Sequence, residues 1–143
     1  MNALRWLLRA GVAGLFLFAA VKKISDPADF LTAIRTFHAL PDPAAVGLAL
    51  WLPWAELAGA FAVFWPRHRR AALWALLVLT FVFLGALGQA WVRGLDINCG
   101  CFGGAAAVRG AGYLRPMARD LVLLGALAWL LWQESRERLS SVS

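Results

Sequence analysis

Residues 71–92 read AALWALLVLTFVFLGALGQAWV, a run of 22 residues without a charged side chain. A helix rises about 1.5 Å per residue and the hydrocarbon core of a bilayer is about 30 Å thick, so a run of this length crosses it. A second apolar run, residues 44–65, precedes it across the short basic sequence Pro66-Arg67-His68-Arg69-Arg70. Together the two runs predict a helical hairpin that spans a membrane.

Two further apolar runs flank this hairpin. The first covers residues 4–21 and is followed by a pair of lysines, and the last covers residues 116–132. A cleaved signal peptide is the alternative interpretation of the first run, because two arginines precede a short apolar stretch. The lysines at its end favour a membrane span instead. We therefore expect an all-α bundle of four transmembrane helices, forming a single domain over residues 1–143.

The composition agrees with a membrane protein and excludes several other classes. Hydrophobic residues make up 62% of the chain and charged residues 15%, against about 45–50% and 25% in soluble domains. The net charge of +6 suits anionic lipid better than nucleic acid, since no basic helix or RNA-binding signature accompanies it. No phosphate-binding loop, nucleophile–base pair or metalloprotease helix supports nucleotide or hydrolytic chemistry.

A short amphipathic helix is predicted between the first two spans. Ser25 or Asp26 can cap its first turn, and Pro27 suits the first helical position. Its apolar residues recur at i, i+4 and i+7 as Phe30, Ile34 and Phe37. The helix is too short to span, so we expect it to lie on the bilayer surface and to end at residues 41–43.

The distribution of basic residues gives the expected orientation. Lysines and arginines are equally divided between the two sides of a four-span arrangement, but three arginines are concentrated in the tight turn at residues 66–70. Short basic turns of this kind stay in the cytoplasm. We therefore expect cytoplasmic termini in the inner membrane, with the loop at residues 93–115 outside. Four tryptophans then fall near the cytoplasmic interface, namely Trp6, Trp65, Trp74 and Trp132.

The two cysteines of the chain, Cys99 and Cys101, are separated by one residue in that loop. Their Cα atoms lie within about 7 Å, so a disulfide between them is sterically possible. Such a small, strained ring exchanges readily, and it closes almost no loop, so it adds little stability. The pair therefore predicts redox exchange. The alternatives are two idle thiols, or two soft ligands for a metal such as copper(I) that a partner completes.

Glu56 is the second candidate, because a carboxylate in mid-span must be paired, protonated or exposed to a wet cavity. Pro53 and Gly59 share its helix face, where another helix could approach closely. One interpretation is a proton relay or an anchor for a polar head group, and the other is a structural ion pair that fixes helix registry. The candidate partners are Lys23, Gln89 and Arg119.

Arg119 and Asp120 form the third candidate group. Helical neighbours point about 100° apart, so we expect the two side chains to meet different partners, Arg119 pairing with Glu56 or Asp96. A surface position is favoured for both.

The remaining polar and small residues of the spans suggest no further site. Gly85 and Gly88 give the third span a small face suited to helix packing. His38 and His68 have no second ligand at a metal-like spacing. We expect both histidines to be solvated, and no metal site is predicted from them.

Several sequence blocks resemble the MauE/DoxX-like family of small four-helix membrane proteins, and the MauE branch in particular. The resemblance covers most of the chain, from about residue 4 to residue 131. The blocks that carry it are FAAVKKI at 18–24 with DPADF at 26–30, LPWAEL at 52–57 with Gly59, RGLDI at 93–97 with CGCFG at 99–103, and Arg119-Asp120-Leu121.

The resemblance implies a function in protein maturation outside the cytoplasm. In the MauE branch it implies a periplasmic cysteine loop, a thioredoxin-like partner and maturation of the disulfide-rich small subunit of methylamine dehydrogenase. The architecture is also similar to quinone-linked disulfide-forming membrane proteins of the DsbB and VKOR type, which carry further cysteines. This chain has no second cysteine pair, so a complete thiol-to-quinone relay within it is not expected from the resemblance.

We therefore predict a membrane thiol–disulfide component, and as an enzyme it would be a thiol–disulfide oxidoreductase. Cys99 and Cys101 would be the reacting residues, and a quinone could bind near Glu56, Gln89 and Arg119. The supporting polar residues are Lys23, Glu56, Asp96, Arg119 and Asp120. A non-enzymatic assembly subunit and a protein that handles metals or small molecules remain alternatives. The sequence leaves a homo-oligomer open.

Overall fold

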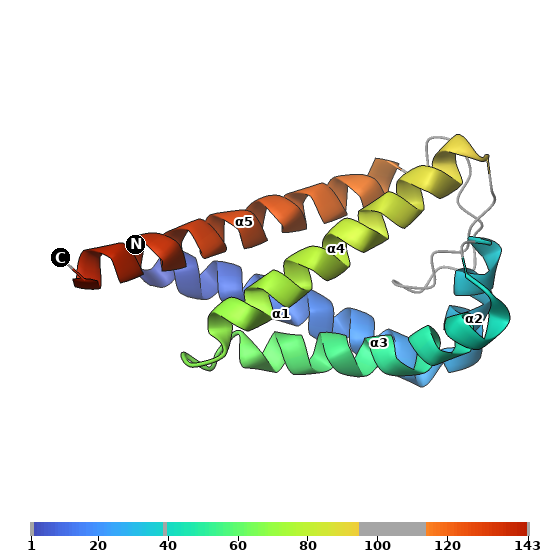
Figure 1. Cartoon of the computed structure of the whole chain (residues 1–143), viewed down its shortest axis with the longest axis horizontal. Coiled ribbons are helices and arrows are strands. Elements are labelled where there is room, and N and C mark those ends of the chain that lie inside the picture. Colours follow the sequence, from blue (N-terminus) through green and yellow to red (C-terminus); the bar gives the residue numbers. More distant parts are fainter. Residues whose placement is uncertain (1, 39, 95–113, 143) are drawn as a thin grey trace.

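The structure is a computed structural model that describes residues 2–38, 40–94 and 114–142. Within these ranges the regular structure is helical, with α1 (Asn2–Ser25), α2 (Pro27–Thr36), α3 (Asp42–Ala62), α4 (Arg69–Val92) and α5 (Leu114–Val142). The four long helices run along one axis, and the short α2 lies across one end (Figure 1). Both termini and the α3–α4 turn lie at the opposite end (Figure 1).

The outer faces of the long helices are suited to lipid. Three helices, α1, α3 and α4, are long and apolar enough to cross a membrane. They expose large apolar side chains such as Trp51, Phe61, Phe81 and Val82, and helices keep their backbone groups hydrogen-bonded within the bilayer. The chain is therefore a helical membrane protein that crosses the bilayer more than once.

The start of α2 agrees with the sequence prediction. Asp26 caps the helix, and its side chain accepts a hydrogen bond of 3.1 Å from the backbone N–H of Asp29. The apolar face of α2 differs from the prediction, because Phe30 is buried and packs with Ala49 and Leu52 of α3. This face of α2 therefore contacts the protein interior.

Two helix boundaries also differ from the prediction. The segment at residues 41–43 begins α3 instead of ending α2, because Pro41 takes the N-cap position and α3 runs from Asp42. Asp42 accepts two hydrogen bonds from Arg35, at 2.7 and 2.8 Å, which ties the two helices together. At the other end of α2, α1 continues through Lys23 to Ser25, so that this lysine belongs to the long helix.

The bundle is built from two closely packed pairs of helices. α1 packs mainly on α3, and α4 mainly on α5, while smaller contacts join α3 to α4 and α1 to α5. The shared core contains Val63, Leu73, Leu76, Leu127 and Leu130, all of them fully buried. Gly59 lies where α3 meets α4, because a Cβ placed there would be 2.8 Å from Cδ2 of Leu76. The close approach predicted for this face of α3 is therefore present.

Gly59 gives a first prediction about stability. Gly59→Ala should lower the free energy of unfolding by about 1 kcal/mol, because overpacking against the buried Leu76 exceeds the gain in helix propensity. Gly47→Ala is the matched control in the same helix, since a Cβ placed at that position would meet no atom within 4 Å, and it should be neutral or stabilising. Equilibrium unfolding in mild detergent measures both. Equal effects of the two substitutions would contradict the tight α3–α4 contact.

A network of ion pairs joins the helices at the end where the termini lie. Arg9 of α1 is buried and pairs with Glu134 of α5, and Arg69 of α4 reaches the same carboxylate at 3.1 Å. Arg69 also donates a hydrogen bond of 3.2 Å from Nε to the carbonyl of Val63. Three helices therefore converge on one acidic side chain.

The sequence prediction did not identify this network, although the sequence contains a signal for it. Arg5 and Arg9 are one turn apart on α1, and Glu134 and Glu137 are one turn apart on α5. Residues three or four apart share a helix face, so the two helices present matching rows of opposite charge. Arg5 pairs with Glu137 accordingly.

Candidate functional site

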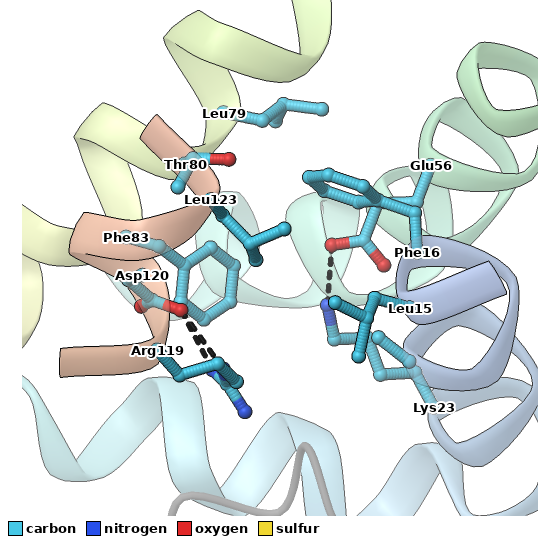
Figure 2. Close-up of a pocket in the computed structure, with 11 residues that line it drawn as sticks. Leu15, Phe16, Lys23, Glu56, Leu79, Thr80, Phe83, Arg119, Asp120 and Leu123 are labelled. Carbon is cyan, nitrogen blue, oxygen red and sulfur yellow. Dashed lines mark hydrogen bonds and ion pairs between the residues drawn. The ribbon is translucent and has the colours of Figure 1, made fainter. Parts of the chain in front are cut away.

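A small polar cavity lies between the two pairs of helices. Its volume is about 40 Å³. Figure 2 shows the charged side chains on two opposite sides of the cavity, with apolar side chains between them. The polar residues that line it are Lys23, Glu56, Thr80, Arg119 and Asp120. Four of these five residues were predicted from the sequence as supporting polar residues.

Lys23 and Glu56 form the more deeply buried pair. Nζ of Lys23 lies 2.5 Å from Oε1 of Glu56, and the two side chains are only 2% and 3% exposed. The ammonium group also lies over two aromatic rings, 5.0 Å from the centre of Phe30 and 4.7 Å from that of Phe83. Aromatic faces attract cations, so α2 and α4 help to hold the lysine beside its carboxylate. Of the three candidate partners of Glu56, the structure selects Lys23.

Arg119 and Asp120 face the same cavity, which contradicts the prediction that they point to different partners on the surface. Nε and Nη2 of Arg119 donate hydrogen bonds of 3.0 and 2.8 Å to Oδ1 of Asp120. The long arginine side chain folds back along the helix, so the 100° angle between neighbours does not separate the two charged groups. Asp120 is buried, whereas the side chain of Arg119 is 28% exposed.

The second oxygen of each carboxylate lacks a hydrogen-bond partner among the described residues. These atoms are Oε2 of Glu56 and Oδ2 of Asp120, and both are buried. A buried acceptor without a donor is costly. The cavity is larger than the roughly 10–15 Å³ that one water molecule requires. It can therefore hold a water or another small polar molecule beside Glu56 and Asp120.

A larger, apolar cavity of about 360 Å³ lies between α2, α3 and α4. Leu79 and Phe83 line both cavities, so the two are neighbours within the bundle. Gln89 lines the apolar cavity, whereas Glu56 and Arg119 line the polar one. The three residues expected around a quinone therefore belong to two adjoining cavities.

The other predicted site residues fall into two groups. Asp96, Cys99 and Cys101 lie outside the described residues. Within the described ranges, no group of three or more histidine, cysteine, aspartate or glutamate side chains could hold a metal ion. His38 and His68 are both exposed.

The predicted packing role of Gly85 and Gly88 does not apply among the described residues, since a Cβ at either position would meet nothing within 4 Å. Of the glycines considered in the sequence, Gly59 is the one at which two described helices approach closely.

Comparison with known proteins gives one consistent family. The family model described as "Methylamine utilisation protein MauE" matches residues 1–133. The proteins named "Methylamine utilization protein MauE" from Paracoccus versutus and Paracoccus denitrificans are 36% and 38% identical to the chain over 100 and 98 residues. These alignments cover 69% and 68% of the chain, and 54% and 53% of the two relatives.

A protein of the same name from Methylorubrum extorquens is 31% identical over 126 residues, which cover 87% of the chain and 68% of the relative. The chain thus spans about half the length of the two Paracoccus relatives it matches. No solved structure matches the chain significantly.

Proposed function

Because the chain belongs to the MauE family, we propose that it is a membrane thiol–disulfide component that exchanges disulfides with a thioredoxin-like protein outside the cytoplasm. Cys99 and Cys101 are the reacting residues of this proposal. The observation that carries it is their spacing, since a disulfide between such near neighbours contributes little to stability and exchanges readily. An assembly function alone would not require this cysteine spacing.

The proposal includes four membrane spans, with α5 as the fourth and α2 at the interface. The apolar part of α5, residues 121–132, is short for a span. Arg119 and Asp120 are paired with each other and face an internal cavity, which allows the buried part of α5 to begin near Pro116. The termini and the basic α3–α4 turn share one end of the bundle (Figure 1), and we assign this end to the cytoplasm of a cell with an inner membrane.

This topology supports an external position for the cysteines. α4 ends at Val92 and α5 begins at Leu114, and both of these helix ends lie at the end of the bundle opposite the termini (Figure 1). Disulfides persist in the periplasm and are rare in the cytoplasm. The Lys23–Glu56 pair joins α1 to α3, and in the proposal it holds these two helices in register, whereas the Arg119–Asp120 pair lies within α5.

The proposed reaction is a reversible two-step exchange. A thiolate of the reduced protein attacks the disulfide of the other, which forms a mixed disulfide and releases one thiol. The second cysteine of the attacking pair then attacks the sulfur of the first and breaks the mixed disulfide. The attacking protein ends with a disulfide, and the other protein ends with two thiols. Two electrons pass between the proteins, and in the oxidising direction a membrane quinone could take them with two protons to become a quinol.

The names of the relatives suggest the biological setting. Three curated relatives are named for methylamine utilisation, and we propose that this chain supports the maturation of a disulfide-containing periplasmic protein in such a setting.

Trapping of the mixed disulfide tests the proposal. Cys101→Ser should accumulate a mixed disulfide between Cys99 and a periplasmic thioredoxin-like protein, because no second thiol is left to resolve it. Non-reducing electrophoresis with mass spectrometry identifies the adduct. Two matched controls accompany this variant. Cys99→Ser leaves Cys101 as the cysteine that can form the mixed disulfide, and the variant that lacks both cysteines should form no adduct.

The cysteine variants, together with functional and metal assays, distinguish the alternatives. An assembly subunit would form no adduct, and its function would survive loss of both cysteines but not disruption of α2 at Phe30. A copper-binding protein would instead be purified with stoichiometric metal that is lost in the double cysteine variant. If neither single variant forms an adduct and the double variant functions normally, the exchange proposal is wrong.

A further inference from the structure

The end of the bundle where the termini lie carries most of the net positive charge of the chain. Residues 2–10, 63–72 and 130–142 come together there (Figure 1), and these segments contain seven arginines, no lysine and two glutamates. Their side chains therefore have a net charge of +5, out of +6 for the whole chain. The surplus positive charge of the protein is thus concentrated at one end.

The two glutamates of this end are already bound by arginines. Arg9 and Arg69 pair with Glu134, and Arg5 pairs with Glu137. The other four arginines are exposed and form no ion pair with a described residue. These four residues make up the arginine surface, namely Arg67, Arg70, Arg136 and Arg138. Because Arg69 contacts Glu134, the exposed arginines of the α3–α4 turn and those of α5 lie on either side of one helix contact.

Exposed tryptophans accompany the arginine surface. Trp6, Trp65 and Trp132 come from α1, the α3–α4 turn and α5, and each is at least half exposed. Tryptophan is enriched at the boundary between lipid and water. The guanidinium carbon of Arg136 lies 4.0 Å from the centre of the Trp132 ring, so this arginine lies at the depth of an interfacial side chain. A contact with the face of a ring leaves most of the five N–H donors of an arginine available to an acceptor.

We propose that the arginine surface binds the phosphate groups of anionic phospholipids such as phosphatidylglycerol. Guanidinium groups bind phosphate oxygens through paired N–H donors, and Trp132 places Arg136 at the level of lipid head groups. This position suits a lipid better than an acidic protein, which would approach from the water. The inference goes beyond the proposed function and involves neither cysteine.

Lipid binding to the full chain in a mild detergent tests the proposal. Native mass spectrometry should show that phosphatidylglycerol binds more tightly than phosphatidylcholine with the same acyl chains. Arg67→Gln, Arg70→Gln and Arg136→Gln should each weaken the binding of phosphatidylglycerol about fivefold, the loss expected for one arginine at an anionic surface. The triple variant should lose the preference for phosphatidylglycerol.

The matched control removes the same charge from the other end of the bundle. Lys22, Arg93 and Arg115 are exposed near the end of α1, the end of α4 and the start of α5. The triple variant Lys22→Gln/Arg93→Gln/Arg115→Gln therefore has the same net charge as the triple variant of the arginine surface. It should keep the wild-type preference for phosphatidylglycerol, because the arginine surface is intact.

Each other outcome would overturn the proposal. Equal binding of the two lipids by the wild type would show that the phosphate groups are not recognised, and equal losses in the two triple variants would show attraction by net charge alone. Displacement of phosphatidylglycerol by an equal concentration of inorganic phosphate would identify a site for free anions, and displacement by less oligoglutamate would identify an acidic polypeptide as the partner. The variant without cysteines should bind phosphatidylglycerol normally, so this experiment and disulfide trapping can fail independently.

Discussion

Glu56→Leu is expected to lower the free energy of unfolding by about 3–5 kcal/mol, because it leaves the buried ammonium group of Lys23 without its carboxylate. Lys23→Met should cost a similar amount for the converse reason. The double variant Lys23→Met/Glu56→Leu should recover most of the loss, since apolar side chains of similar volume often replace a buried ion pair at little cost. Unfolding of purified protein in mild detergent measures all three.

The comparison with an exposed ion pair makes this prediction specific. Arg35 and Asp42 form a pair whose side chains are 48% and 67% exposed, and Asp42→Ala should change stability by no more than about 1 kcal/mol. A double variant at Lys23 and Glu56 that is no more stable than the single variants would show that the two side chains are not coupled. Large, equal losses at Asp42 and Glu56 would show that burial is not the cause.

Glu134→Leu should have the second largest effect, a loss of about 2–3 kcal/mol. The substitution removes the carboxylate that pairs with both Arg9 and Arg69, which come from two other helices. The expected loss is smaller than at Glu56, because the side chains of Glu134 and Arg69 are 15% and 17% exposed and water can partly solvate the freed cations.

Glu137 provides the matched control for this substitution. It lies one turn further along α5, pairs with Arg5 and has a half-exposed side chain. Glu137→Leu should therefore change the free energy of unfolding by no more than about 1 kcal/mol. Equal losses at the two positions would contradict the role of Glu134 as the residue that joins three helices.

Much of the helical architecture could be predicted from the sequence because apolar runs and helix caps are local signals. The runs that contain residues 71–92 and 44–65 became α4 and α3 within a few residues, and Asp26 caps α2 as expected. The predicted end of α2 was wrong, because prolines such as Pro41 and Pro43 can either stop one helix or begin the next. Tertiary contacts, among them the Arg35–Asp42 pair, decide between these possibilities.

The candidate site was predicted in part for a similar reason. An acidic residue in mid-span requires a partner, and this requirement pointed to Lys23, Gln89 and Arg119, of which the structure pairs Lys23 with Glu56. The orientation of Arg119 could not be predicted from helix geometry, because a long side chain can reach its neighbour across 100° of helix surface. Gln89 lines a different cavity from Glu56 and Arg119. This separation depends on how the helices pack, and it could not be predicted from local sequence patterns.

The two pairs of helices are joined unequally along their length. Near the termini, Glu134 connects α5 with α1 and α4, and Gly59 brings α3 against Leu76. Towards the α2 end, the space between the pairs contains the polar cavity. Because these contacts are concentrated near the termini, thermal separation of the two helix pairs should be smallest at that end of the bundle and largest at the end where α4 stops and α5 begins.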